Sequence, residues 1–319
     1  LSRNLVSVRL LRELGIKNAL DYLQRFDFSA GALPRDLSLA LGSYAMTPLE
    51  VASMYATIAN GGYKVKPYIV DAIYSRDNKL IYQANPAIAC DDCMETDSNE
   101  NATASGIAHQ TTTFSADDIF EEADSLDELI NKNASTSSLS KASEEEAPSQ
   151  EQPAVYAERI MDERVAFILD NILLDVIKRG TATKARALGR SDLAGKTGTT
   201  NGPTDAWFSG YHPKLVTTTW LGFDDNQKLG RREFGGSAAL PIWMDYMEDI
   251  LPDLPVAKRK QPEGLLALKI DRLTGKAPST KTEETLFEIF REEFAPDFSL
   301  HNQPATTDQL ESVLEESLF

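Results

Sequence analysis

The sequence predicts an α/β fold of the α+β type, in which an antiparallel sheet is flanked by helices. Three short segments between 194 and 223 are rich in β-branched and aromatic residues and are separated by tight polar turns. This spacing is typical of a three-stranded antiparallel meander. Apolar residues recur at helical spacing over 162–179, before the meander, and over 238–251, after it. We therefore expect helices to flank the sheet.

The N-terminal part predicts a mainly helical region followed by a β-hairpin. An apolar stripe over 5–14 indicates a helix that ends at Gly15, and a second short helix is expected over 18–26. In the segment TPLEVASMYATIANGG, Thr47 is the expected N-cap and Glu50 completes a capping box. This segment therefore predicts a third helix, which precedes the hairpin expected in YIVDAIYSRDNKLIYQA.

The acidity of the chain is concentrated in two segments. The whole chain has a formal net charge of −17, but residues 91–152 carry 16 acidic and 2 basic side chains, and residues 282–319 carry 10 acidic and 1 basic. The remainder therefore has a net charge of +6. Because aromatic and basic residues do not interleave there, no nucleic-acid partner is expected.

We expect one domain that is interrupted by an insertion. The acidic segment 94–153 contains few large apolar residues, so it is predicted to be mostly disordered. The interrupted domain then consists of 1–93 and 154–254. Residues 255–319 are expected to form an acidic C-terminal extension, in which a short helix can form over 283–294.

The two cysteines, Cys90 and Cys93, lie close together in the string ACDDC. Two cysteines cannot form a four-ligand zinc site without histidines, and His109, His212 and His301 are distant in sequence. No strand and helix flank the string as they would in a thioredoxin-like redox site. A local disulfide in an oxidising compartment is favoured, with free thiols as the alternative. No metal and no cofactor are expected.

The stretch AGKTGTTNGPTDAWFSGY is the strongest candidate for a ligand-binding strand. In a strand, Thr197 and Thr199 point to one face, and Gly198 between them lets a ligand approach the backbone. Lys196 and the threonine hydroxyls could hold a substrate carboxylate, and the Thr199 N–H could stabilise an oxyanion. Thr200 is included as a further substrate-binding residue. The alternative is an ordinary edge strand that its lysine protects.

Ser2 and Asn4 form an S-x-N triplet at the start of the first expected helix. The Ser2 hydroxyl could relay a proton. The Asn4 amide could bind a substrate amide and orient a neighbouring lysine. The alternative for this triplet is a simple helix N-cap.

Secondary candidates lie near the candidate strand. Thr181 and Thr183 in RGTATKA could lie near a cleft, but helix termination is the favoured role. Asp205 and Trp207 could shape a cleft wall, although roles in the turn and the core are favoured. His212, in the turn that follows, is expected to be structural.

Three longer blocks resemble the transpeptidase domain of class A penicillin-binding proteins: LSRNLVSVRLLRELGI, LALGSYAMTPLEVASMYATIANGG and GKTGTTNGPTDAWFSGYHPKLVTTTWLGFDD. The resemblance covers about 1–93 and 156–251, and the CxxC string with its polar insertion is similar to the 1A type of Gram-negative bacteria. In this group, K-T-G acts with S-x-N and S-x-x-K, whose serine is acylated. The resemblance implies a penicilloyl-serine-transferase, β-lactamase-like fold with an antiparallel sheet beside an all-helical region.

The resemblance also implies D,D-transpeptidation of peptidoglycan stem peptides. A serine attacks the penultimate D-Ala, the terminal D-Ala leaves, and a neighbouring amine resolves the acyl-enzyme. Lys196, Thr197 and Thr199 match the third motif, and Ser2 and Asn4 match the second. Implied partners are stem peptides, inhibitory β-lactams and other cell-wall synthesis proteins, at the periplasmic face of the bacterial inner membrane. Class A members also carry a glycosyltransferase domain and a membrane anchor, which we expect in a missing N-terminal part.

The nucleophile motif departs from the family pattern. S-x-x-K should precede S-x-N, so it is expected before Leu1, in a chain that we interpret as a fragment. The one S-x-x-K present, Ser138 to Lys141, falls in the insertion and is interpreted as coincidental. The fragment alone is therefore expected to be inactive, whereas its parent is expected to be an enzyme. The alternatives are a non-catalytic cell-wall interaction module on the same fold and a serine β-lactamase or β-lactam sensor.

Overall fold

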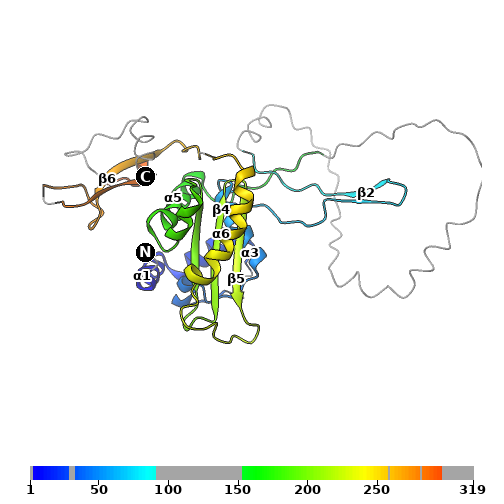
Figure 1. Ribbon diagram of the computed structural model, residues 1–319. Helices are drawn as coiled ribbons and strands as arrows, with labels where there is room; N and C mark the ends of the chain where they lie inside the picture. Colours follow the sequence, from blue (N-terminus) through cyan, green and yellow to red (C-terminus); the bar gives the residue numbers. More distant parts are fainter. Residues whose placement is uncertain (1–2, 29–32, 91–152, 258, 281, 297–319) are drawn as a thin grey trace, which may run out of the picture. The chain divides into compact units, whose positions relative to one another are not determined.

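The computed structural model (Figure 1) describes residues 3–28, 33–90, 153–257, 259–280 and 282–296. Within these ranges, no helix is both long and apolar enough to cross a bilayer. The described residues up to Cys90 and from Ala154 onward belong to one compact unit. The expected insertion lies outside the described residues, so the domain boundaries stay a prediction.

The antiparallel meander that the sequence predicts forms the central sheet. β3 (Ala194–Thr199), β4 (Asp205–His212) and β5 (Leu215–Gly222) lie in the order β3-β4-β5. In the register of the first pair, Lys196 lies opposite Ser209. Because β3 stands at one end of the strand order, it is an outer strand of this sheet.

The expected N-terminal helices form where their caps indicate. α1 (Asn4–Leu14) ends at Gly15, whose φ of 88° is open to glycine but strained for other residues. α3 (Pro48–Ala59) begins after Thr47, and both hydrogen bonds of the capping box between Thr47 and Glu50 are present. The local signals in this region therefore decide where the helices start and stop.

Two further helices differ from the sequence prediction only at their ends. α2 (Ile16–Leu23) starts directly after Gly15, two residues before the expected start, and continues into a 3-10 turn at Gln24–Phe26. α5 (Glu163–Arg179) has Asp162 as its N-cap, whose carboxylate accepts the N–H of Arg164 at 2.9 Å.

The closing helix begins later than expected. α6 (Leu240–Ile250) is preceded by a π-helical turn, Gly235–Ala239, and followed by a 3-10 turn, Leu251–Asp253. The expected helix at 238–251 therefore consists of three consecutive helical types. The π-helical turn contributes to the candidate site described below.

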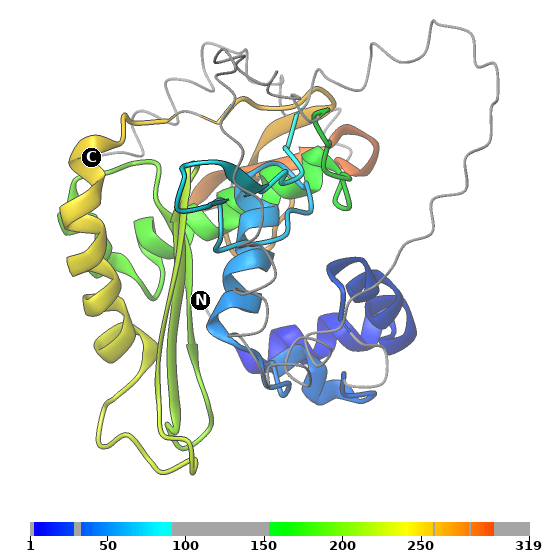
Figure 2. The ribbon, with the colours of Figure 1, turned by 90° about the vertical axis from the view of Figure 1, so that its right-hand side faces the viewer.

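Helices cover both faces of the sheet, with α6 on one side and α3 on the other (Figure 2). On the first face, Trp243 of α6 packs against Phe208 of β4, with their ring centroids 4.9 Å apart. On the second face, Tyr211 packs against Leu173 of α5 and Tyr55 of α3. Side chains of β4 alternate between these two clusters, as the two-residue period of a strand requires.

The predicted hairpin after α3 is confirmed. β1 (Ala72–Tyr74) pairs with β2 (Leu80–Gln83) in antiparallel fashion. The turn is closed by a hydrogen bond of 2.8 Å from Ser75 N to Lys79 O. Asn78 adopts a φ of 58°, a conformation that asparagine tolerates better than most residues.

The residues that flank segment 91–152 are joined to each other by backbone hydrogen bonds. Ile88 N donates to Val155 O at 2.8 Å, and Ala157 N donates to Ile88 O at 2.9 Å. Cys90 is disulfide-bonded, and its carbonyl accepts the hydroxyl of Tyr63 at 2.8 Å. The other cysteine of the sequence, Cys93, lies outside the described residues.

The prediction of a short helix over 283–294 is wrong. Residues Thr285–Arg291 form β7, which pairs with β6 (Leu265–Asp271) along its whole length. Leu266 lies opposite Phe290, and Ile270 lies opposite Leu286, so their side chains form one small apolar cluster. Apolar residues in ETLFEIFREEF fit a helical period as well as a strand, and pairing with the distant partner strand decides the outcome.

Two buried carboxylates attach the segment after α6 to the core. Asp170 of α5 is 2% exposed, and its Oδ1 lies 2.7 Å from Arg259 Nε and accepts the Tyr211 hydroxyl at 2.7 Å. Asp192 binds Arg190 through both of its oxygens and accepts the N–H of Ala257 at 2.9 Å. The sequence analysis did not find this arrangement, because its partners are far apart in the chain.

Candidate active site

The outer edge of β3 carries the residues that the sequence analysis selects. Thr200 N donates to Asp205 O at 3.2 Å, next to the pair Thr199–Ala206. Hydrogen-bonded pairs alternate along an antiparallel ladder, so the peptide groups of Gly198 and Lys196 face β4. The N–H and C=O groups of Thr197 and Thr199 therefore point to the opposite, outer edge.

Lys196 brings a positive charge to that edge. It pairs with Ser209, which places it on the sheet face that α3 and α5 cover. Its Nζ donates to Thr197 O at 2.8 Å, so the ammonium reaches the outer edge of the strand. Burial lowers the pKa of Lys196, because the surroundings disfavour the charged form. An anion bound nearby would stabilise the ammonium.

Thr199 is held by the π-helical turn that precedes α6. The N–H of Gly235 donates to Thr199 Oγ1 at 3.0 Å, which leaves the hydroxyl proton of Thr199 available to a ligand. A Cβ on Gly235 would lie 2.4 Å from Gly198 O and 2.3 Å from Trp207 O. Only glycine therefore allows the turn to pack this closely on β3 and β4.

Thr197 forms a hydroxyl pair with a residue at the end of α5. Its Oγ1 lies 2.7 Å from Thr181 Oγ1. Thr197 and Thr199 share the sheet face of Phe208 and Ala206, as the strand alternation predicts. The sequence analysis considered Thr181 near a cleft but favoured helix termination; the structure brings its hydroxyl to this strand.

The hydroxyl of Thr200 holds the turn that follows β3. Its Oγ1 accepts the N–H groups of Thr204 and Asp205, at 3.0 and 2.9 Å, and lies 2.8 Å from Thr204 Oγ1. These three interactions use the hydroxyl to hold the turn between β3 and β4. The Thr200 hydroxyl thus has a structural role in this turn, and its role in substrate binding stays a prediction.

An aromatic pair lies next to Gly198 on the same face as Lys196. Trp207 is directly opposite Gly198, and its ring centroid is 5.9 Å from that of Trp220. Trp220 Nε1 donates to Asp205 Oδ1 at 3.0 Å. Asp205 thus joins the turn to the aromatic pair, in the structural role that the sequence favours.

The second motif is described only in part. Asn4 is the first residue of α1, while the N-cap position is Arg3, with no side-chain cap bond. Asn4 itself therefore does not cap the helix. In the described part of the chain, its exposed amide makes no hydrogen bond. Ser2 lies outside the described residues, as do Ser138 and Lys141.

His212 lies outside the site, as the sequence predicts. It is fully buried, and its Nδ1 accepts the N–H of Lys214 at 3.2 Å. Its Nε2 faces Asp192 Oδ2 at 3.1 Å and Pro255 O at 3.2 Å. Two acceptors at Nε2 and one donor at Nδ1 fit a neutral imidazole that carries its proton on Nε2. This histidine stabilises the fold.

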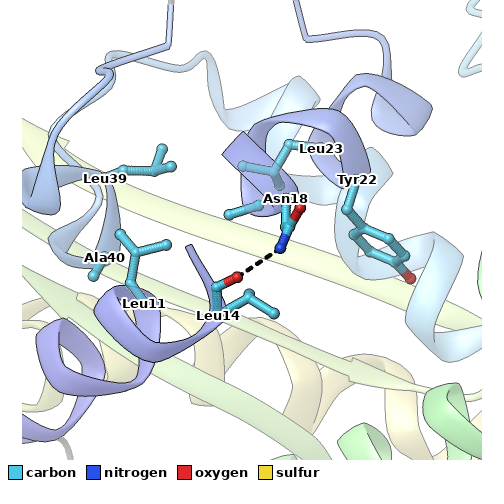
Figure 3. Close-up of a pocket in the computed structure, with 8 residues that line it drawn as sticks. Leu11, Leu14, Asn18, Tyr22, Leu23, Leu39 and Ala40 are labelled. Carbon is cyan, nitrogen blue, oxygen red and sulfur yellow. Dashed lines mark hydrogen bonds between the residues drawn. The ribbon is translucent and has the colours of Figure 1, made fainter. Parts of the chain in front are cut away.

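A cavity of about 500 Å³ lies among the N-terminal helices (Figure 3). Apolar side chains such as Leu11, Leu23 and Leu39 line it, and the Asn18 amide donates to Leu14 O at 2.8 Å. Its lining contains no ionisable side chain other than the Tyr22 phenol. This cavity therefore offers few groups for acid–base chemistry.

The chain is similar to a known protein family and to several of its members. The family described as "Penicillin binding protein transpeptidase domain" matches residues 1–248. Penicillin-binding protein 1A of Pseudomonas aeruginosa is 42% identical over 295 residues, which are 92% of this chain and 34% of that protein. Penicillin-binding protein 1A of Neisseria gonorrhoeae is 35% identical over 83% of this chain and 25% of that protein.

A solved structure is similar as well. The crystal structure of Penicillin-Binding Protein 1A from Haemophilus influenzae matches with a TM-score of 0.68 and 29% identity, over 96% of this chain and 40% of that chain. The present chain thus spans between 25% and 40% of the length of these relatives.

Proposed function

The chain belongs to the family of penicillin-binding protein transpeptidase domains, and from this premise we propose that it supplies the substrate-binding strand of a peptidoglycan D,D-transpeptidase. The motifs predicted this family, and the matches confirm it together with the penicilloyl-serine-transferase fold. The observation that carries the proposal is the outer edge of β3, where peptide groups that face away from β4, hydroxyls and an ammonium lie together.

Such an edge suits an extended peptide that ends in a carboxylate. A bound stem peptide would add to β3 as a further strand, through the peptide groups of Thr197 and Thr199. Its carboxylate would accept hydrogen bonds from the hydroxyls of these two residues, in the field of Lys196. Because hydrogen bonds to a carboxylate are stronger than neutral ones, this end of the peptide fixes its position along the strand.

In the proposed reaction, a serine Oγ attacks the carbonyl carbon of the penultimate D-Ala. The C–O bond forms, the peptide C–N bond breaks, and the serine proton passes to the departing D-Ala amine. The Thr199 N–H stabilises the oxyanion, Asn4 binds the substrate amide, and Ser2 and Lys196 assist proton transfer. A second amine then attacks the ester carbonyl and forms a new peptide bond, the ester C–O bond breaks, and the amine proton passes to the departing serine Oγ.

We place the nucleophile in a part of the protein upstream of this chain. Support comes from Ser138 to Lys141, the one S-x-x-K of the sequence, which follows rather than precedes S-x-N. The relatives named Penicillin-binding protein 1A are also about three times longer, since the chain covers 34% of one of them. The chain alone is then inactive.

The same relatives support a proposal for the whole protein. It would be a bifunctional glycosyltransferase and transpeptidase, anchored in the inner membrane with this domain in the periplasm. Its partners would be stem peptides, β-lactams and other cell-wall synthesis proteins. An oxidising periplasm agrees with the disulfide at Cys90.

Intact-mass analysis with a penicillin tests the proposal. The chain extended upstream through S-x-x-K should gain the mass of one β-lactam on an upstream serine, while residues 1–319 alone should gain none. No adduct on a folded, extended protein would refute the enzyme and favour the non-catalytic module. Rapid loss of the adduct by hydrolysis would instead favour the β-lactamase.

A further inference from the structure

We propose that Thr181 is a positioning residue for carboxylate recognition at the outer edge of β3. Its hydroxyl holds that of Thr197, so that the pair presents one O–H group to the terminal carboxylate of the substrate. The inference rests on the function proposed above, because it adds a residue to the same site.

The end of α5 fixes Thr181 beside β3. The N–H groups of Gly180 and Ala182 both donate to Val176 O, each at 3.1 Å. A Cβ on Gly180 would lie 2.6 Å from the Cα of Val176, so this position admits only glycine. Ala182 on the other side is fully buried. Thr181 is therefore anchored through both neighbours while remaining exposed itself.

The Thr181 hydroxyl is not needed to end the helix. The two backbone bonds to Val176 already do so, whereas a hydroxyl that ends a helix would bond within its own last turn. Instead, Thr181 Oγ1 lies 2.7 Å from Thr197 Oγ1, in a separate element. The Thr181 side chain thus contacts β3 rather than its own helix.

Counting protons shows what the pair offers to a ligand. Two hydroxyls carry two protons, and the hydrogen bond between Thr181 and Thr197 uses one of them. The other proton can point outward. When an anion binds, Thr197 can donate to it while Thr181 donates to Thr197, and donors in such a chain strengthen one another.

The π-helical turn confines this pair from a third side. A Cβ on Gly236 would lie 3.2 Å from Thr181 O and 3.8 Å from Thr197 Cγ2. The pair therefore lies next to α5, β3 and this turn, while Thr181 stays accessible to solvent. A carboxylate that approaches along the strand edge meets preorganised donors, which lowers the ordering cost of binding.

The test uses the full-length protein and three variants. Thr181→Val removes the hydroxyl at nearly constant volume, and Thr181→Ser restores it. Thr183→Val is the matched control, because Thr183 is also exposed, lies two residues away and makes no side-chain hydrogen bond in the described part of the chain. The thermal unfolding midpoint of each variant shows that the fold is intact.

The readout is the acylation rate with benzylpenicillin and with its methyl ester, measured over a range of concentrations. Thr181→Val should lower the second-order rate constant for the acid about 10- to 100-fold, mainly through weaker binding. It should also reduce the preference for acid over ester. Thr181→Ser and Thr183→Val should behave like the wild type.

Two outcomes overturn the inference in different ways. If the wild type is acylated and Thr181→Val matches it in rate and in preference for the acid, Thr181 has no positioning role, and the proposed function stands. If the wild type is not acylated by either compound, the proposed function fails, and the inference fails with it.

Discussion

Replacing Arg259 by alanine should destabilise the protein strongly, because the variant leaves a buried carboxylate without its cation. Asp170 is 2% exposed, and its Oδ1 lies 2.7 Å from Arg259 Nε. Removing one partner of a buried ion pair typically costs about 3–5 kcal/mol. The Tyr211 hydroxyl still donates to Asp170 at 2.7 Å, so we expect the lower end, about 3 kcal/mol.

The effect should depend on pH in a defined direction. Burial raises the pKa of Asp170, while Arg259 and the Tyr211 hydrogen bond act against that rise. Without Arg259, the pKa of Asp170 in the folded state rises further. The folded state then binds more protons than the unfolded state over the window between the two pKa values, so the free energy of unfolding falls as pH rises through it. The penalty should therefore be smaller at pH 5.5 than at pH 7.5.

Urea unfolding followed by tryptophan fluorescence measures both effects. The control is Arg272→Ala, since Arg272 lies 2.8 Å from Glu284 in an ion pair whose side chains are 59% and 64% exposed. Exposed pairs of this kind contribute less than about 1 kcal/mol. If Arg259→Ala loses no more stability than Arg272→Ala at pH 7.5, or if its loss is the same at pH 5.5, the argument from burial is wrong.

Three further predictions concern the insertion and the site. Replacing 94–152 by a four-residue linker should leave the fold intact. It should raise the free energy of unfolding by at most about 2 kcal/mol, because a shorter loop closes at a lower entropic cost. Loss of the urea transition would contradict this prediction. Gly235→Ala should lower the free energy of unfolding, measured in urea, by about 1–3 kcal/mol and slow acylation. The effect should be smaller for Gly236→Ala, whose Cβ would meet its neighbour at 3.2 Å. Lys196→Met should slow β-lactam acylation of the full-length protein at least about tenfold, as followed by intact mass, and an unchanged rate would remove this ammonium from the site.

Local signals explain why much of the fold can be predicted from the sequence. The capping box of Thr47 and Glu50 needs only residues three apart, and it forms as expected. The meander is similarly local, because each turn joins adjacent strands. In contrast, β7 depends on pairing with a strand about 20 residues earlier, and its apolar pattern also suits a helix. Arg259 and Asp170 are far apart in the chain, so no local pattern indicates their contact.

The candidate site, too, can be predicted from the sequence only in part. Strand alternation correctly separates Lys196 from the face shared by Thr197 and Thr199. It cannot show that the turn uses the Thr200 hydroxyl, nor that Thr181 pairs with Thr197, since both facts depend on how distant backbones approach. Gly180, which precedes Thr181, ends α5 and also positions the next side chain.

Gly198 shows why the outer edge of β3, rather than either face, is left for a ligand. The sequence analysis assigned this glycine to the approach of a ligand. In the structure, a Cβ on Gly198 would lie 3.0 Å from Trp207 Cβ, and one on Gly235 would lie 2.4 Å from Gly198 O. Gly198 is therefore in close contact with Trp207 on one face of the sheet and with Gly235 on the other. The neighbouring strand β4 occupies one edge of β3. The remaining edge presents the peptide groups of Thr197 and Thr199, so an extended peptide that binds at this strand must add to that edge.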